Sequence, residues 1–198
     1  MGALEMGSQV AFPQRGALMI EVLITIVIVA IGLGGLMLMQ SRLQKSEVEA
    51  YQRTQALMLV NDMVNRISAN RADAASYAIG AEDDETSIGG GVCPTASATL
   101  QERDRAEWCN ALKGAAERES GNSVGALIGG RGCVYELAGG REYMVTVVWQ
   151  GLTPISSPTV ICGKEAPNPY DGPAGSDCVD DLCRRSLSTV IRLGTLPP

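Results

Sequence analysis

Residues 17–39, with the sequence ALMIEVLITIVIVAIGLGGLMLM, constrain this chain more than any other segment. They number about 23, and a helix rising about 1.5 Å per residue over that length crosses the roughly 30 Å hydrocarbon core of a bilayer. The only charged residue in the run is Glu21. A charged side chain within a span costs about 2.5–3.5 kcal/mol on insertion scales, so its presence usually indicates a function. The run therefore predicts a membrane-spanning helix with a functional carboxylate near its start.

The order of polar and apolar residues predicts that this segment is retained. An ordinary secretory signal places its apolar core before a small-residue cleavage site, so that the core is discarded. Here residues 1–15 are mixed in polarity and contain no apolar core, and the polar chain resumes directly after the run with Gln40, Ser41 and Arg42. We therefore expect the apolar helix to belong to the mature protein.

The rest of the 198-residue chain is long enough for one domain with a modest core. Its formal net charge is -6, and it contains no dense run of lysine or arginine. The sequence thus lacks the basic surface by which proteins bind nucleic acids. Neither DNA nor RNA is expected as a direct partner.

Six cysteines follow the apolar run, and none lies within or before it. They are Cys93, Cys109, Cys133, Cys162, Cys178 and Cys183. This even number and one-sided placement are typical of a domain that is exported to an oxidising compartment and carries up to three disulfides. Because the chain has no histidine and only one closely spaced cysteine pair, no zinc site is expected. Six cysteines allow 15 pairings, and the sequence does not choose among them.

Arg15-Gly16 followed by Ala17-Leu18-Met19-Ile20-Glu21 resembles the class III signal of type IV prepilins and type II secretion pseudopilins. The resemblance implies that a prepilin peptidase cuts between Gly16 and Ala17 on the cytoplasmic side and methylates the new amino terminus of Ala17. Glu21 then becomes the fifth residue of the mature chain, where the family has its glutamate. Ala17 departs from the phenylalanine that is more usual at the mature start.

The same resemblance implies a role for Glu21 in assembly. In the family this glutamate is thought to neutralise the amino terminus of a neighbouring subunit as the helices pack into a filament. Such pairing is physically sound, because two opposite charges leave water tolerably only when they meet. The alternative is a signal anchor in which the Glu21 side chain reaches back to the membrane interface.

Residues 30–44, AIGLGGLMLMQSRLQ, resemble the minor pilins of the PilV type, also called type IV pilus modification proteins. A looser resemblance continues further along the chain. That family has a helix with Asp and Trp, a glycine-rich turn, and a hairpin whose second strand ends in Trp. Asp104, Trp108, residues 129–132 and Trp149 stand in those places.

Two helices are predicted beyond the span. Apolar residues spaced three or four apart over residues 57–67 predict an amphipathic helix that continues from the membrane to about Ser76 or Gly80. A second helix is predicted over residues 99–119, where Thr99 and Glu102 have the spacing of a capping box. The apolar stripe of the first helix is Leu57, Val60, Val64 and Ile67, flanked by Leu59 and Met63.

Three strands are predicted in the second half, because apolar and polar residues alternate there. The first two cover residues 133–138 and 142–150 and are joined by the glycine-rich residues 139–141 as a tight hairpin. The third covers residues 187–193. In the second strand, one face is expected to consist of Tyr143, Val145, Val147 and Trp149.

Residues 81–98 and 151–185 are predicted loops, and disulfides are expected to order the longer one. The acids at 82–85 lack the regular alternation of a calcium-binding loop and are expected to be solvated. Asp177, Asp180 and Asp181 are likewise expected on solvated surface. The chain has no histidine as general base, no phosphate-binding loop and no paired-carboxylate motif, so it is not expected to be an enzyme or to bind a cofactor.

The predicted fold is α+β and pilin-like. A leader (1–16) is followed by a transmembrane or filament-core helix (17–40), its amphipathic continuation (41–80) and a head (81–198) with a small antiparallel sheet and disulfide-braced loops. The resemblance implies a single-pass inner-membrane protein with a periplasmic head, which then enters a pilus filament or its tip. Implied partners are other minor and major pilins, the prepilin peptidase, the pilus assembly platform and a tip adhesin. The alternatives are a minor pseudopilin of a type II secretion system and a monomeric, membrane-anchored periplasmic binding protein.

Overall fold

A computed structural model gives the structure of the chain. It describes residues 17–95, 98–115, 118–120, 122–123, 125, 127–137, 139–165 and 167–194. The chain forms two compact units that divide between Lys45 and Ser46. Each unit is described by itself.

The first unit consists of the N-terminal part of helix α1, which runs over Ala17–Ala69. It contains an 18-residue window with a mean hydropathy of 2.8, of which 0% is buried. The long apolar helix predicted from residues 17–39 is thus confirmed. By length and composition it is a candidate membrane span.

In the second unit, α1 packs one face into the main core of the head. The predicted apolar stripe is partly wrong, because Leu57 is 50% exposed while Met63 is fully buried. Ala56, next to Leu57 in the sequence, is the buried residue at this point of the helix. Because alanine is only weakly hydrophobic, the sequence pattern favoured Leu57 instead. The buried positions of α1 recur every three or four residues, as a single helix face requires. They are Gln52, Ala56, Val60, Met63 and Ile67.

The α-helix ends earlier than predicted. It stops at Ala69, and a 3₁₀ helix, η1, follows over Arg71–Tyr77. Asn70 has non-helical backbone angles (φ -112°, ψ 45°), and its side-chain amide donates a hydrogen bond to the Tyr77 hydroxyl at 3.3 Å. Asparagine readily exchanges helical geometry for such local bonds, which explains the break.

Helix α2 covers Leu100–Leu112, and its predicted capping box is confirmed. The Glu102 carboxylate accepts a hydrogen bond from the backbone N–H of Thr99 at 3.3 Å. The predicted end at residue 119 is wrong, because Gly114 (φ +75°) follows the C-cap Lys113 and terminates the helix as a left-handed residue. The chain then forms a short ribbon of β1 (Arg118–Glu119) and β2 (Asn122–Ser123).

The predicted three-stranded antiparallel sheet is confirmed. Its strands are β3 (Arg131–Glu136), β4 (Glu142–Gln150) and β5 (Arg184–Arg192), in the spatial order β3-β4-β5. Gly139 (φ +108°) and Gly140 (φ +69°) lie between β3 and β4, where the left-handed backbone favours glycine. β5 begins three residues before the predicted position 187, because its polar first residues pair with the end of β4.

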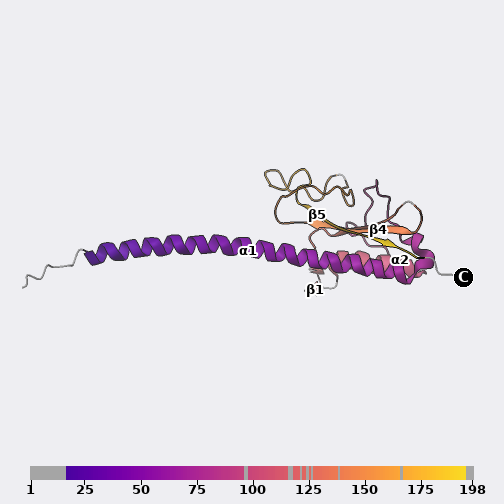
Figure 1. The fold of residues 1–198 in the computed structure, drawn as a ribbon, viewed down its shortest axis with the longest axis horizontal. Coiled ribbons are helices and arrows are strands. Elements are labelled where there is room, and N and C mark those ends of the chain that lie inside the picture. Colours follow the sequence, from indigo (N-terminus) through magenta and orange to yellow (C-terminus); the bar gives the residue numbers. More distant parts are fainter. Residues whose placement is uncertain are drawn as a thin grey trace, which may run out of the picture. The chain divides into compact units, whose positions relative to one another are not determined.

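Both faces of the sheet are covered, which makes the head a layered α+β structure. In Figure 1 the sheet lies between the part of α1 that belongs to the second unit, residues 46–69, and the long loop that precedes β5. The predicted inward face of β4 is confirmed: it packs with α1 and α2 through Tyr143, Val145, Val147 and Trp149. The opposite face forms a second cluster of Cys133, Tyr135, Val148, Cys162 and Tyr170.

Trp108 connects α2 to both α1 and the sheet. Its side chain is fully buried, and its indole N–H donates to the Leu59 carbonyl of α1 at 2.9 Å. A Cβ atom at Gly132 would lie 2.3 Å from the Trp108 ring. Glycine at this position in β3 therefore makes room for the indole.

Candidate functional site

The residues predicted for processing and assembly lie at the start of α1. Gly16 is outside the described residues, while Ala17 is the first residue of the helix. Glu21 follows one turn later, between Ile20 and Val22, which are 61% and 55% exposed. Within the part of the chain that the structure describes, no cation pairs with Glu21. Its carboxylate thus lies on an apolar helix surface.

The six cysteines form three disulfides, as predicted. The pairing that the sequence left open is Cys93–Cys109, Cys133–Cys162 and Cys178–Cys183. Their Cα–Cα distances of 5.6, 6.0 and 5.2 Å lie in the normal range. The first joins a loop to α2, the second joins β3 to the loop after β4, and the third closes a short loop before β5. The disulfides therefore brace the irregular parts of the head.

The three disulfides are expected to contribute unequally to stability, because a cross-link that closes a longer loop restricts the unfolded chain more. The sequence separation is 29 residues for Cys133–Cys162 and 5 for Cys178–Cys183. Replacing the first pair with alanines should lower the free energy of unfolding by about 3–4 kcal/mol, and replacing the second by about 2 kcal/mol. Urea unfolding of the full chain in nonionic detergent, followed by tryptophan fluorescence, measures both. A larger loss for the second pair would contradict this account of loop closure.

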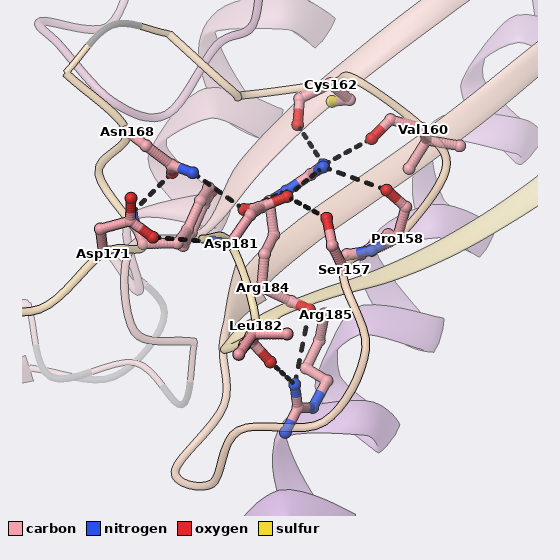
Figure 2. Close-up of polar contacts among 11 residues, drawn as sticks. Ser157, Pro158, Val160, Cys162, Asn168, Asp171, Asp181, Leu182, Arg184 and Arg185 are labelled. Atoms are coloured by element: carbon pink, nitrogen blue, oxygen red, sulfur yellow. Dashed lines mark hydrogen bonds and ion pairs between the residues drawn. The ribbon is translucent and has the colours of Figure 1, made fainter. Parts of the chain in front are cut away.

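A buried ion pair organises the loop between β4 and β5 (Figure 2). Asp181 and Arg184 are 2% and 1% exposed, and an Oδ2 to Nη2 distance of 2.7 Å joins their side chains. The prediction of a solvated Asp181 is therefore wrong, whereas Asp177 and Asp180 are exposed as expected. The sequence did not predict this difference, because all three aspartates lie in the same polar loop and their burial depends on how that loop folds.

The Arg184 guanidinium gathers backbone carbonyls from the preceding loop. Its Nη1 donates to the carbonyls of Val160 at 2.7 Å and Cys162 at 3.1 Å, and its Nη2 donates to that of Pro158 at 3.4 Å. In Figure 2 these carbonyls converge on the guanidinium from one side, with Asp181 on the other. The start of β5 is thereby fixed to the segment that carries Cys162.

The Asp181 carboxylate, like the Arg184 guanidinium, has several hydrogen-bond partners. It accepts hydrogen bonds from the Ser157 hydroxyl at 2.7 Å and the Asn168 amide at 3.1 Å, besides those from Arg184. Burial alone would raise the pKa of Asp181, but these hydrogen bonds outweigh it and lower the pKa below its ordinary value. Asp181 has a positive φ of 66°, a conformation that aspartate and asparagine tolerate better than most residues.

A second polar cluster, which sequence reasoning missed, joins α1, η1 and α2. Arg66 of α1 binds the carboxylates of Asp104 and Glu107 of α2, each at 2.7 Å. The Tyr77 hydroxyl donates to Asp104, and burial together with this bond raises the pKa of Tyr77 to about 12. The available signal was Asp104 itself, an acid four residues before Trp108 and thus on the inward side of the predicted helix.

These arrangements of ion pairs, hydrogen bonds and disulfides connect the elements of the head. Within the described ranges, no three or more cysteine and acidic side chains are grouped so that they could hold a metal ion. No protein-family model, curated protein or solved structure matches this chain. The functional proposal therefore rests on the residues and their geometry.

Proposed function

We propose that this chain is a minor type IV pilin of the PilV type. It is processed after Gly16, enters the pilus filament or primes its tip, and supports pilus assembly, twitching motility and adhesion. The observation that carries the proposal is Glu21, the only charged residue in an apolar run that follows Arg15-Gly16 directly. This arrangement resembles the prepilin signal, in which the glutamate is the fifth mature residue.

The exposed apolar surface of α1 supports the proposal, because other apolar groups must cover a surface of this kind. Large side chains over residues 19–39 are each more than half exposed in the isolated chain. Lipid covers such a surface before assembly, and neighbouring helices cover it in a filament. Gly32, Gly34 and Gly35 lie on open helix surface, because a Cβ atom added there would meet no atom within 4 Å. Small residues at such positions allow neighbouring helices to approach closely.

The head supports the same proposal through its disulfides. Three cross-links in a small domain suit a protein that folds in an oxidising compartment and persists outside the cell. The chain is then a single-pass protein of the inner membrane whose head faces the periplasm. Its partners are other minor and major pilins, the prepilin peptidase, the assembly platform and a tip adhesin.

Recovery in surface filaments tests this proposal. Filaments sheared from cells that produce the native chain should contain it in much smaller amounts than the major pilin. Deleting its gene should lower the number of surface pili. Recovery in the inner membrane alone, together with unchanged pili in the deletion strain, would contradict the proposal and favour a membrane-anchored binding protein.

A further inference from the structure

A groove of about 570 Å³ opens within the second unit, between α1, the start of β5 and the loop after β4. From α1 it is lined by Ser46, Glu49 and Arg53, and from β5 by Arg185 and Ser186. Ser156 lines it from the loop, and Trp149 and Ile155 supply an apolar wall. Neither Glu21 nor a cysteine lines the groove, and nothing in the proposed assembly role uses it.

The lining is rich in hydrogen-bond donors that have no partner among the described residues of the protein. Among the described residues, the hydroxyls of Ser46, Ser156 and Ser186 make no hydrogen bond, and the Arg53 guanidinium has neither a hydrogen bond nor an ion pair. A hydroxyl can also accept, but a guanidinium only donates. Four unused donor groups around one groove favour a ligand that is rich in acceptor oxygens.

The charges of the lining leave one positive charge uncompensated. Arg184 is paired with Asp181 at 2.7 Å, and Arg185 lies 3.5 Å from Glu49. The Glu49 carboxylate is also engaged by the Thr153 hydroxyl at 2.9 Å. Among the described residues that line the groove, Arg53 therefore remains as the free cation, and an anion would complete it.

We infer that this groove binds a phosphate ester, with Arg53 supplying the charge and the three serine hydroxyls supplying hydrogen bonds. Arginine suits phosphate because its planar donors match the phosphate oxygens. Trp149 and Ile155 offer apolar contact to the organic part of the ester. The ester can come from solution or from a phospholipid headgroup, because only six residues of chain lie between Met39 and Ser46, a reach of at most about 25 Å.

Tryptophan fluorescence of the full chain tests this inference, because Trp149, which is 4% exposed, lines the groove, whereas Trp108 is 0% exposed and does not line it. The chain is purified in nonionic detergent and titrated with glycerol phosphate at constant ionic strength. In parallel it is reconstituted in nanodiscs of phosphatidylcholine with and without phosphatidylglycerol. A saturable change with glycerol phosphate identifies a soluble ester, and a difference between the two kinds of nanodisc identifies an anionic phospholipid headgroup; at least one of the two is expected.

Two arginine variants decide whether the change reports the groove. Arg53→Gln is expected to raise the dissociation constant at least tenfold, because it removes the one uncompensated charge among the described residues that line the groove. Arg103→Gln, at an exposed arginine of α2 outside the groove, should leave it unchanged. The inference would be overturned by the absence of a saturable change with glycerol phosphate together with identical fluorescence in the two kinds of nanodisc. Equal weakening by the two variants would also overturn it, because binding would then follow net charge alone.

Discussion

Glu21→Ala is expected to reduce the amount of this chain in sheared filaments at least tenfold, while its insertion in the inner membrane is preserved. In the proposed filament, Glu21 meets the methylated amino terminus of a neighbouring subunit away from water. Removing one member of such a pair leaves the other charge buried and alone, which costs about 2–5 kcal/mol. Insertion itself should become easier, since the span loses its only charge. Immunoblots of the filament and membrane fractions measure both quantities.

Glu47→Ala is the matched control, because Glu47 lies on the same helix beyond the apolar run and is exposed. This variant should enter filaments at the level of the native chain. Normal incorporation of Glu21→Ala would remove the main physical support for the filament proposal. Loss of both variants from the membrane fraction would indicate a folding defect and contradict the specific role of Glu21.

Asp181→Asn is expected to lower the free energy of unfolding of the head by about 3–5 kcal/mol, because it leaves the charge of Arg184 buried without a counter-ion. Arg184 is 1% exposed, so water does not replace the lost carboxylate. Asparagine keeps the shape of the side chain and tolerates the positive φ of this residue, which separates the charge effect from backbone strain. Urea unfolding in nonionic detergent measures the loss. Asp177→Asn, at an exposed acid of the same loop, should have little effect.

The same pair predicts how stability depends on pH. The folded pKa of Asp181 is lowered, so its contribution is present above the unfolded value of about 3.9 and is lost as the pH falls through the folded pKa. Unfolding experiments from pH 7 downward should show this loss in the native chain below about pH 4. In Asp181→Asn that part of the acid dependence should be missing. An unchanged acid profile would contradict the role given to the pair.

Local patterns predicted those parts of the fold that local physics decides. Strict alternation in β4 placed Tyr143, Val145, Val147 and Trp149 on one face, and that face packs against α1 and α2. Gly139 and Gly140 marked the hairpin, because their left-handed backbone is nearly specific to glycine. The apolar run over residues 17–39 similarly decided the N-terminal helix, since few other structures suit so long an apolar stretch.

The sequence did not predict the features that depend on contacts between residues far apart in the chain. The number of cysteines predicted three disulfides, but their pairing needs the path of the loop that brings Cys162 beneath β3. Asp181 was predicted to be solvated because its burial depends on distant contacts. Its partner Arg184 donates hydrogen bonds to backbone carbonyls that lie more than twenty residues earlier in the chain. The predicted ends of α1 and α2 were too late in the chain. The helices stop at Ala69 and Leu112 because single residues just beyond them, Asn70 and Gly114, have non-helical backbone conformations.

Intact-mass and N-terminal peptide mass spectrometry of the chain, purified from cells that contain a prepilin peptidase, tests the central claim most directly. If residues 1–16 are a prepilin leader, the mature chain begins at Ala17 with a methylated amino terminus, and Glu21 is its fifth residue. A chain that keeps Met1, or one that begins after Met39, would contradict the account.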